Sequence, residues 1–192
     1  VIYSGDTGVN ELQIAKNIKI ATNQTGDAAF LTVENAIGDF TANYPTAPVN
    51  TSGVALESAN VTDRNTYNGI AIPHNYTFNF GPGAAELDVL NDSGVSIYNT
   101  TTYAAGQNIP LPTGIDVTLS GNPLPGESLT MGEQENVSIF ETINDAIAWM
   151  EQGSTSENLE QNQVDYNTIL DQLNSSTSHI TSRRVDSGIR LQ

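Results

Sequence analysis

From Ser138 to Met150 the sequence reads SIFETINDAIAWM, and this stretch decides the architecture of the chain. Ser138 and Glu141 have the spacing of a capping box, in which the serine accepts a hydrogen bond from the first helical turn and the glutamate reaches back. Apolar residues then gather on one side of a helical wheel and polar residues on the other. The stretch therefore predicts an amphipathic helix that starts after Ser138 and ends at Gly153.

A second helix is predicted from Glu157 to the end of the chain, and at 1.5 Å per residue it would be about 50 Å long. Its apolar residues form a narrow stripe with a seven-residue repeat, which is typical of a helix that supercoils with a partner. We call these six residues the apolar stripe and expect them to form an assembly and packing surface: Leu159, Tyr166, Ile169, Leu170, Leu173 and Ile180. The segment 174–179 has no apolar residue and weak helix formers, so it should be the softest part of the helix.

Before these helices the chain reads as short strands. Residues 11–14 and 18–21 alternate around Asn17, which predicts a β-hairpin with one buried face. Further strands are predicted at 54–61, 76–80, 87–90, 95–98, 115–119 and 128–131. Strands at this spacing predict a small antiparallel sandwich or barrel-like domain.

The domain organisation follows from these elements. We expect residues 1–45 to hold the hairpin and turns of a rod domain, 46–132 to form an inserted antiparallel β domain, and 133–192 to supply the C-terminal helices of the rod. Residues 35–53 are rich in Asn, Thr, Pro and Gly, and they predict a linker or long loop at the boundary.

Composition excludes several classes of function. With 22 acidic and 6 basic residues the net charge is −16, which repels nucleic acid and anionic membrane surfaces. No cysteine is present, so disulfides and thiolate sites are excluded. His74 is expected in a solvated loop, and Trp149 in helix packing. We expect no enzyme, no cofactor and no metal site.

Several blocks of sequence, taken in order, resemble one family. They are Val1–Gly8, Ala21–Phe30, Tyr76–Phe80, Gly114–Pro123, Pro125–Ser128, Asn136–Ile143 and Arg183–Leu191. In these blocks the chain resembles the family of flagellar hook-associated protein 3, the hook–filament junction proteins related to flagellin. Residues 39–67 carry no such resemblance.

The resemblance implies an α+β fold, in which a flagellin-like rod of long α-helices with a small β-hairpin carries an inserted antiparallel all-β domain. It implies a secreted, extracellular structural subunit of the bacterial flagellum that supports filament assembly and motility. The implied partners are the other junction protein (hook-associated protein 1), flagellin, copies of the chain in a ring, and a secretion chaperone. The chain begins at Val1 and shows no terminal helices of the family, so we expect a monomeric piece of a longer protein.

Two other functions fit the same residues. Flagellin would have the same rod with a different outer domain, although the 114–123 block favours the junction protein. A surface carbohydrate-binding β module on a helical stalk is the alternative from another class, but it calls for several exposed aromatic residues and Trp149 is the only tryptophan.

Overall fold

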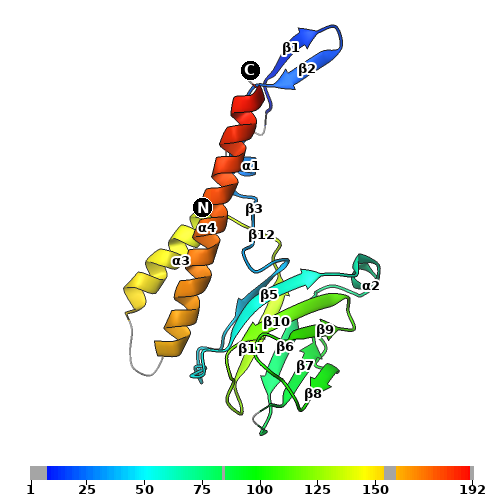
Figure 1. The fold of residues 1–192 in the computed structure, drawn as a ribbon, viewed down its shortest axis with the longest axis vertical. Coiled ribbons are helices and arrows are strands. Elements are labelled where there is room, and N and C mark those ends of the chain that lie inside the picture. The colour runs from blue at the N-terminus through cyan, green and yellow to red at the C-terminus, as the bar shows by residue number, and fades with distance from the viewer. Residues whose placement is uncertain (1–7, 84, 154–158, 191–192) are drawn as a thin grey trace.

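The computed structural model describes residues 8–83, 85–153 and 159–190, and the structural statements below concern these residues. Figure 1 shows a β domain from which a long helix, α4 (Leu159–Arg190), extends. Helix α3 (Ile139–Gln152) lies beside the first half of α4, and the hairpin of β1 (Glu11–Ala15) and β2 (Ile18–Ala21) lies near its C-terminal end.

The β domain consists of two antiparallel sheets. The larger sheet has the order β4-β11-β6-β7-β8, and the smaller has the order β5-β10-β9. The strands of the larger sheet are β4 (Phe40–Asn43), β11 (Ser128–Glu133), β6 (Tyr76–Phe80), β7 (Leu87–Asn91) and β8 (Ser96–Thr100). Those of the smaller sheet are β5 (Ala55–Val61), β10 (Ile115–Ser120) and β9 (Asn108–Leu111).

One hydrophobic core joins the two sheets, as expected for a sandwich. Alternate residues of β6 and β10 are buried, which is the period of two that the sequence shows. Phe78 of the larger sheet and Val117 of the smaller sheet are fully buried in the same cluster. Each such side chain contributes roughly 1.5–3 kcal/mol through the apolar surface that it removes from water. The prediction of antiparallel strands is confirmed, and of the two predicted forms, a sandwich or a barrel-like domain, the two separate sheets correspond to the sandwich.

The linker prediction for residues 35–53 is wrong over its middle part. Phe40 to Asn43 form β4, which pairs with β11, and Phe40 is fully buried. Turn-forming residues surround this strand, so its polar composition hid it. The division into three parts stays a prediction. Because β4 pairs with β11, the chain joins the larger sheet at Phe40, which lies before the predicted boundary at residue 45.

The chain enters the β domain after Val33–Glu34 and leaves it at Asn136–Val137, and these two segments, which we call the two crossings, pair with each other. Strands β3 (Val33–Glu34) and β12 (Asn136–Val137) form a short antiparallel ladder. The amide of Asn35 donates to the carbonyl oxygens of Phe40, at 3.0 Å, and of Gln134, at 2.9 Å. The chain therefore leaves and re-enters the β domain at one place.

Two short helices complete the fold: α1 (Gly26–Phe30), which lies beside α4 (Figure 1), and α2 (Arg64–Asn68). Asp63 caps α2 through the backbone N–H groups of Asn65 and Thr66. The neighbouring turn needs Gly114, which has φ of +81° and would place a Cβ 2.5 Å from the carbonyl oxygen of Asp63.

Both long helices begin and end near their predicted positions. The Ser138 hydroxyl accepts a hydrogen bond of 3.2 Å from the backbone N–H of Phe140, which confirms the predicted N-cap. Gly153 follows α3 with φ of +65°. The predicted cap of the second helix, at 154–156, lies outside the described residues. Among the described residues no helix has the length and apolar character needed to cross a membrane.

Candidate assembly surface

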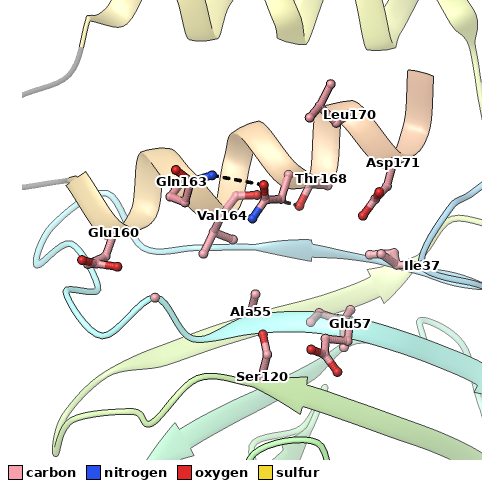
Figure 2. A pocket seen from close by; sticks show the side chains of 13 residues that line it. Ile37, Ala55, Glu57, Ser120, Glu160, Gln163, Val164, Thr168, Leu170 and Asp171 are labelled. Carbon is pink, nitrogen blue, oxygen red and sulfur yellow. Dashed lines mark hydrogen bonds between the residues drawn. The ribbon is translucent and has the colours of Figure 1, made fainter. Parts of the chain in front are cut away.

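The apolar stripe lies on α4, where Ile169 faces Thr41 and Ala42 of β4 but other members of the stripe are exposed. Leu159 is 57% exposed, and Tyr166 and Leu170 are each 38% exposed. Ile169, Leu173 and Ile180 are half-buried. Figure 2 shows Leu170 pointing away from β5. The stripe is therefore only partly covered by the described residues.

Helix α4 instead buries polar side chains. Gln161, Asn162, Gln172 and Ser176 are each at most 8% exposed, and we call them the buried polar face. A buried polar group is costly unless it forms hydrogen bonds. Two of these side chains bond within α4, Gln161 to Asp165 and Ser176 to the carbonyl oxygen of Gln172, whereas Gln172 bonds to the backbone of another segment.

Gln172 shows how this face works. Its Oε1 accepts a hydrogen bond of 2.8 Å from the backbone N–H of Ala36, and its Nε2 donates to the carbonyl oxygen of Glu34 at 3.3 Å. The hydroxyl of Ser175 donates to the same carbonyl at 2.8 Å. One turn of α4 is thus bonded to the backbone at the first crossing into the β domain.

The segment 174–179 continues this contact. Its helix is unbroken, and the Oγ of Ser176 donates to the carbonyl oxygen of Gln172 at 2.8 Å. The Nε2 of His179 lies 2.9 Å from the carbonyl oxygen of Ala28 and 3.5 Å from the Nε of Arg183. The lack of apolar residues at 174–179 in the sequence is consistent with these polar contacts, but it does not show which residues are contacted. That the segment is soft stays a prediction.

Helix α3 packs on α4 through its tryptophan. The rings of Trp149 and Tyr166 have centroids 5.2 Å apart, and the indole N–H donates to the carbonyl oxygen of Asn162 at 3.0 Å. Trp149 is half-buried and serves helix packing, as expected. The opposite side of α3 exposes four large apolar side chains at 38–66%: Phe140, Ile143, Ile147 and Met150.

The hairpin differs from the prediction that one of its faces is buried. Residues 11–19 are all exposed, and Leu12 and Ile18 are 57% and 52% exposed. Since Leu12 pairs with Ile20, and Ile18 lies two residues from Ile20, these three side chains share one face. The alternation predicted the face correctly, but no described part of the chain covers it.

Exposed apolar side chains are unevenly distributed over the molecule. Of seventeen large apolar side chains that are strongly exposed among the described residues, only Ile72, Val95 and Leu124 belong to the β domain. The other fourteen belong to residues 9–30, α3 and α4. On α3, Ile143, Ile147 and Met150 are spaced to lie on one face of the helix, and an exposed apolar patch of this kind marks an interaction site more often than scattered single residues do.

A cleft of about 520 Å³ lies between α4 and the smaller sheet (Figure 2). Carboxylates of Glu57 from β5 and of Glu160 and Asp171 from α4 line it, together with apolar groups such as Ile37 and Val164. No lysine or arginine is among the lining residues. The cleft is therefore acidic and partly apolar.

On the other side of α4, two carboxyl groups lack a positive partner. Burial raises the pKa of Asp165, and the hydrogen bond of 2.9 Å from Gln161 offsets only part of this effect. Burial and the nearby carboxylate of Glu141 raise the pKa of Asp145. The reason is in the sequence, which has no lysine or arginine between Asn136 and Ser182.

His74 is not the solvated residue that we expected. It is 7% exposed, its ring lies 4.1 Å from that of Tyr67, and its Nδ1 is 3.3 Å from a carboxylate oxygen of Glu133. The loop that carries His74 places the imidazole against Tyr67 of α2 and Glu133 of β11, which local composition does not show. No group of three or more His, Asp or Glu side chains within residues 8–83, 85–153 and 159–190 could hold a metal ion.

Comparison with known proteins shows similarity at the level of structure. No family model matches the sequence, and no curated protein matches it. The fold is similar to that of the flagellar junction protein FlgL from Legionella pneumophila, with a TM-score of 0.74, 27% identity, and coverage of 99% of this chain and 60% of the other.

Two further solved structures agree. Flagellar hook-associated protein 3 (HAP-3) from Legionella pneumophila gives a TM-score of 0.77 at 26% identity, covering 99% of this chain and 59% of that one. FlgL from Xanthomonas campestris shares the fold with a TM-score of 0.72 at 21% identity, over 99% of this chain and 60% of that one. The chain thus spans about 60% of the length of these proteins. The resemblance inferred from the sequence is therefore confirmed, since the structural neighbours of this chain are FlgL, the flagellar hook-associated protein 3.

Proposed function

We propose that this chain belongs to a structural subunit of the bacterial flagellum that forms the junction between hook and filament and supports filament assembly and motility. The observation that carries the proposal is the similarity to the Legionella junction protein over 99% of the chain at 27% identity. The exposed apolar surfaces of α3, α4 and the hairpin support it, because an assembly subunit needs surface that other chains cover.

The proposal includes a flagellin-like rod made of the hairpin, α3 and α4, with the β domain inserted into it. The apolar stripe would serve as the packing surface of this rod: Leu159, Tyr166, Ile169, Leu170, Leu173 and Ile180. Its seven-residue spacing suits a partner helix in a left-handed supercoil. The exposure of Leu159, Tyr166 and Leu170 leaves room for such a helix.

The proposed partners follow from the proposed position. They are hook-associated protein 1 on one side, flagellin on the other, further copies of the chain in a ring, and a secretion chaperone before export. The location would be extracellular, on the flagellum, and the role structural rather than enzymatic. Trp149 packs on Tyr166, which argues against its use as a sugar-stacking platform.

Complementation tests the proposal. The complete protein is expressed in the bacterium of origin after deletion of its own copy, with Leu170→Asp as the test variant. Leu170 is 38% exposed, so the aspartate leaves the chain folded but places a charge in the stripe. We expect loss of swimming, and release of flagellin into the medium because no junction forms.

Ile72→Asp is the matched control, since Ile72 is a 79% exposed apolar residue of the β domain. This variant should swim normally. If the Leu170→Asp strain swims with intact filaments, the stripe is not an assembly surface. If deletion of the protein leaves motility intact, the proposed function itself is wrong.

A further inference from the structure

The hairpin combines an uncovered apolar face with positive charge. Leu12, Ile18 and Ile20 share the apolar face, and Leu12 and Ile18 are more than half exposed. Lys16 lies at the turn and forms no ion pair with any described residue, whereas Lys19 pairs with Glu11 at 3.0 Å. The hairpin tip is therefore an apolar and basic projection.

The acidic cleft between α4 and β5 has the complementary character. The carboxylates of Glu57, Glu160 and Asp171 line it without any basic side chain, and Ile37 and Val164 supply apolar surface (Figure 2). A lysine fits such a site, because its apolar stem packs along apolar groups while its ammonium pairs with one of the carboxylates.

The hairpin of the same chain cannot occupy this cleft. It lies at the far end of α4 (Figure 1), and the helix from Glu160 to Arg183 spans about 35 Å. Arg183 and Arg184 add further positive charge at the hairpin end, whereas the sequence from Asn136 to Ser182 has seven acidic residues and no basic one. The two ends of α4 therefore carry opposite charge.

We propose that the cleft between α4 and β5 receives the hairpin turn of a second copy of this chain, with Lys16 paired with Glu160 at the end of the cleft near Gly53. Glu57 and Asp171 line the other end of the cleft and add to its negative charge. The contact is heterologous, because the hairpin of one copy meets the cleft of the next. The net charge of −16 keeps dilute copies apart, so the contact is weak in free solution and depends on salt. The proposal of this contact between two copies does not depend on the position proposed for the protein in the flagellum.

Cysteine cross-linking tests the contact, and the absence of native cysteine makes each introduced thiol unique. One copy carries Ala15→Cys beside Lys16, and the other carries Gln163→Cys, which lines the cleft; both positions are exposed, and Lys16 and the carboxylates are kept. With a short bismaleimide at high protein concentration, we expect a mixed dimer. Its yield should be about tenfold above that of Ala15→Cys with Ser93→Cys, an exposed turn position outside the cleft.

Charge reversal provides the decisive arm. Lys16→Glu in the Ala15→Cys copy should lower the yield about fivefold, and Glu160→Lys in the Gln163→Cys copy should restore it. Circular dichroism confirms that each variant is folded. Equal yields for Gln163→Cys and Ser93→Cys, or a yield that ignores both charge reversals, would overturn the proposal. Neither result bears on the motility assay, so the two proposals fail separately.

Discussion

Gln172 should be a main stabilising contact between α4 and the rest of the chain. It is 6% exposed and forms two hydrogen bonds with the backbone of Glu34 and Ala36, at 3.3 and 2.8 Å. Because the same backbone leads into the β domain, the side chain couples the helix to the crossing. Gln172→Ala removes both bonds without adding bulk.

The magnitude follows from the bonds lost. A typical hydrogen bond contributes about 1 kcal/mol net, so two of them give about 2 kcal/mol. Ala36 is exposed, so water can replace the partner of its N–H and the full cost of a buried unsatisfied donor does not apply. The free energy of unfolding of the helices should therefore fall by about 2 kcal/mol.

Urea unfolding followed by tryptophan fluorescence measures this change. Trp149 is the only tryptophan, and its contact with Tyr166 reports on the packing of α3 against α4. Amide hydrogen exchange should become faster at Ala36, whose N–H loses its acceptor. Gln163→Ala is the matched control, because Gln163 is exposed and its side chain bonds, among the described residues, to Asn167 of the same helix at 3.1 Å.

The control variant should change stability by less than about 0.5 kcal/mol. A Gln172→Ala variant that is as stable as the Gln163→Ala variant, with unchanged exchange at Ala36, would refute the reasoning. It would show that the polar contacts of α4 are formed equally well by water.

Two other predictions concern the β domain. Glu127 accepts hydrogen bonds from the backbone N–H groups of Thr51, Ser52 and Leu124 at 2.5, 3.0 and 2.9 Å. Burial by itself would raise the pKa of Glu127. The hydrogen bonds from Ser52, Leu124 and Thr51 outweigh burial and hold this pKa below its ordinary value. Since the folded pKa is lowered, this stabilisation is present above the unfolded pKa of about 4.3 and is lost as pH falls through the folded pKa. Glu127→Gln should therefore cost about 1–2 kcal/mol at pH 7, since the amide turns an N–H toward that of Leu124. This loss should shrink as pH falls below the unfolded pKa, and a loss in urea unfolding that does not change with pH would contradict this. Gly114→Ala should lower the midpoint of thermal unfolding much more than Gly94→Ala does. Both glycines have positive φ, but only at Gly114 would the new Cβ lie 2.5 Å from the carbonyl oxygen of Asp63. Equal midpoints for the two variants would show that this steric clash does not occur.

Strands and helices were predictable where the pattern is local. The alternation at 76–80 and 115–119 placed β6 and β10, and the Ser138 cap with its apolar wheel placed α3. These signals depend on side chains within one element, so no knowledge of the neighbours is needed. Strand β4 was missed because Phe40 is its only large apolar residue, and its stability depends on pairing with β11.

The candidate site was predicted only in part. The heptad spacing identified the six residues of the apolar stripe, but not how much of it the same chain covers. Periodicity shows which face of a helix is apolar, whereas coverage depends on what the rest of the chain brings to that face. The hairpin is the clearest case: its alternation predicted a buried face, and Leu12 and Ile18 are exposed.

By itself, the sequence determined the elements with a local pattern, such as β6, β10 and α3, together with the acidic charge and the absence of cysteine, because these follow from residue types and their spacing. Only the tertiary structure decided that α4 turns Gln172 and Ser176 inward and Leu170 outward. The physical reason is that the backbone at residues 34–36 offers hydrogen-bond groups that glutamine can satisfy and leucine cannot. A helix buries the face whose chemistry its neighbour matches, and the identity of that neighbour is set by the fold.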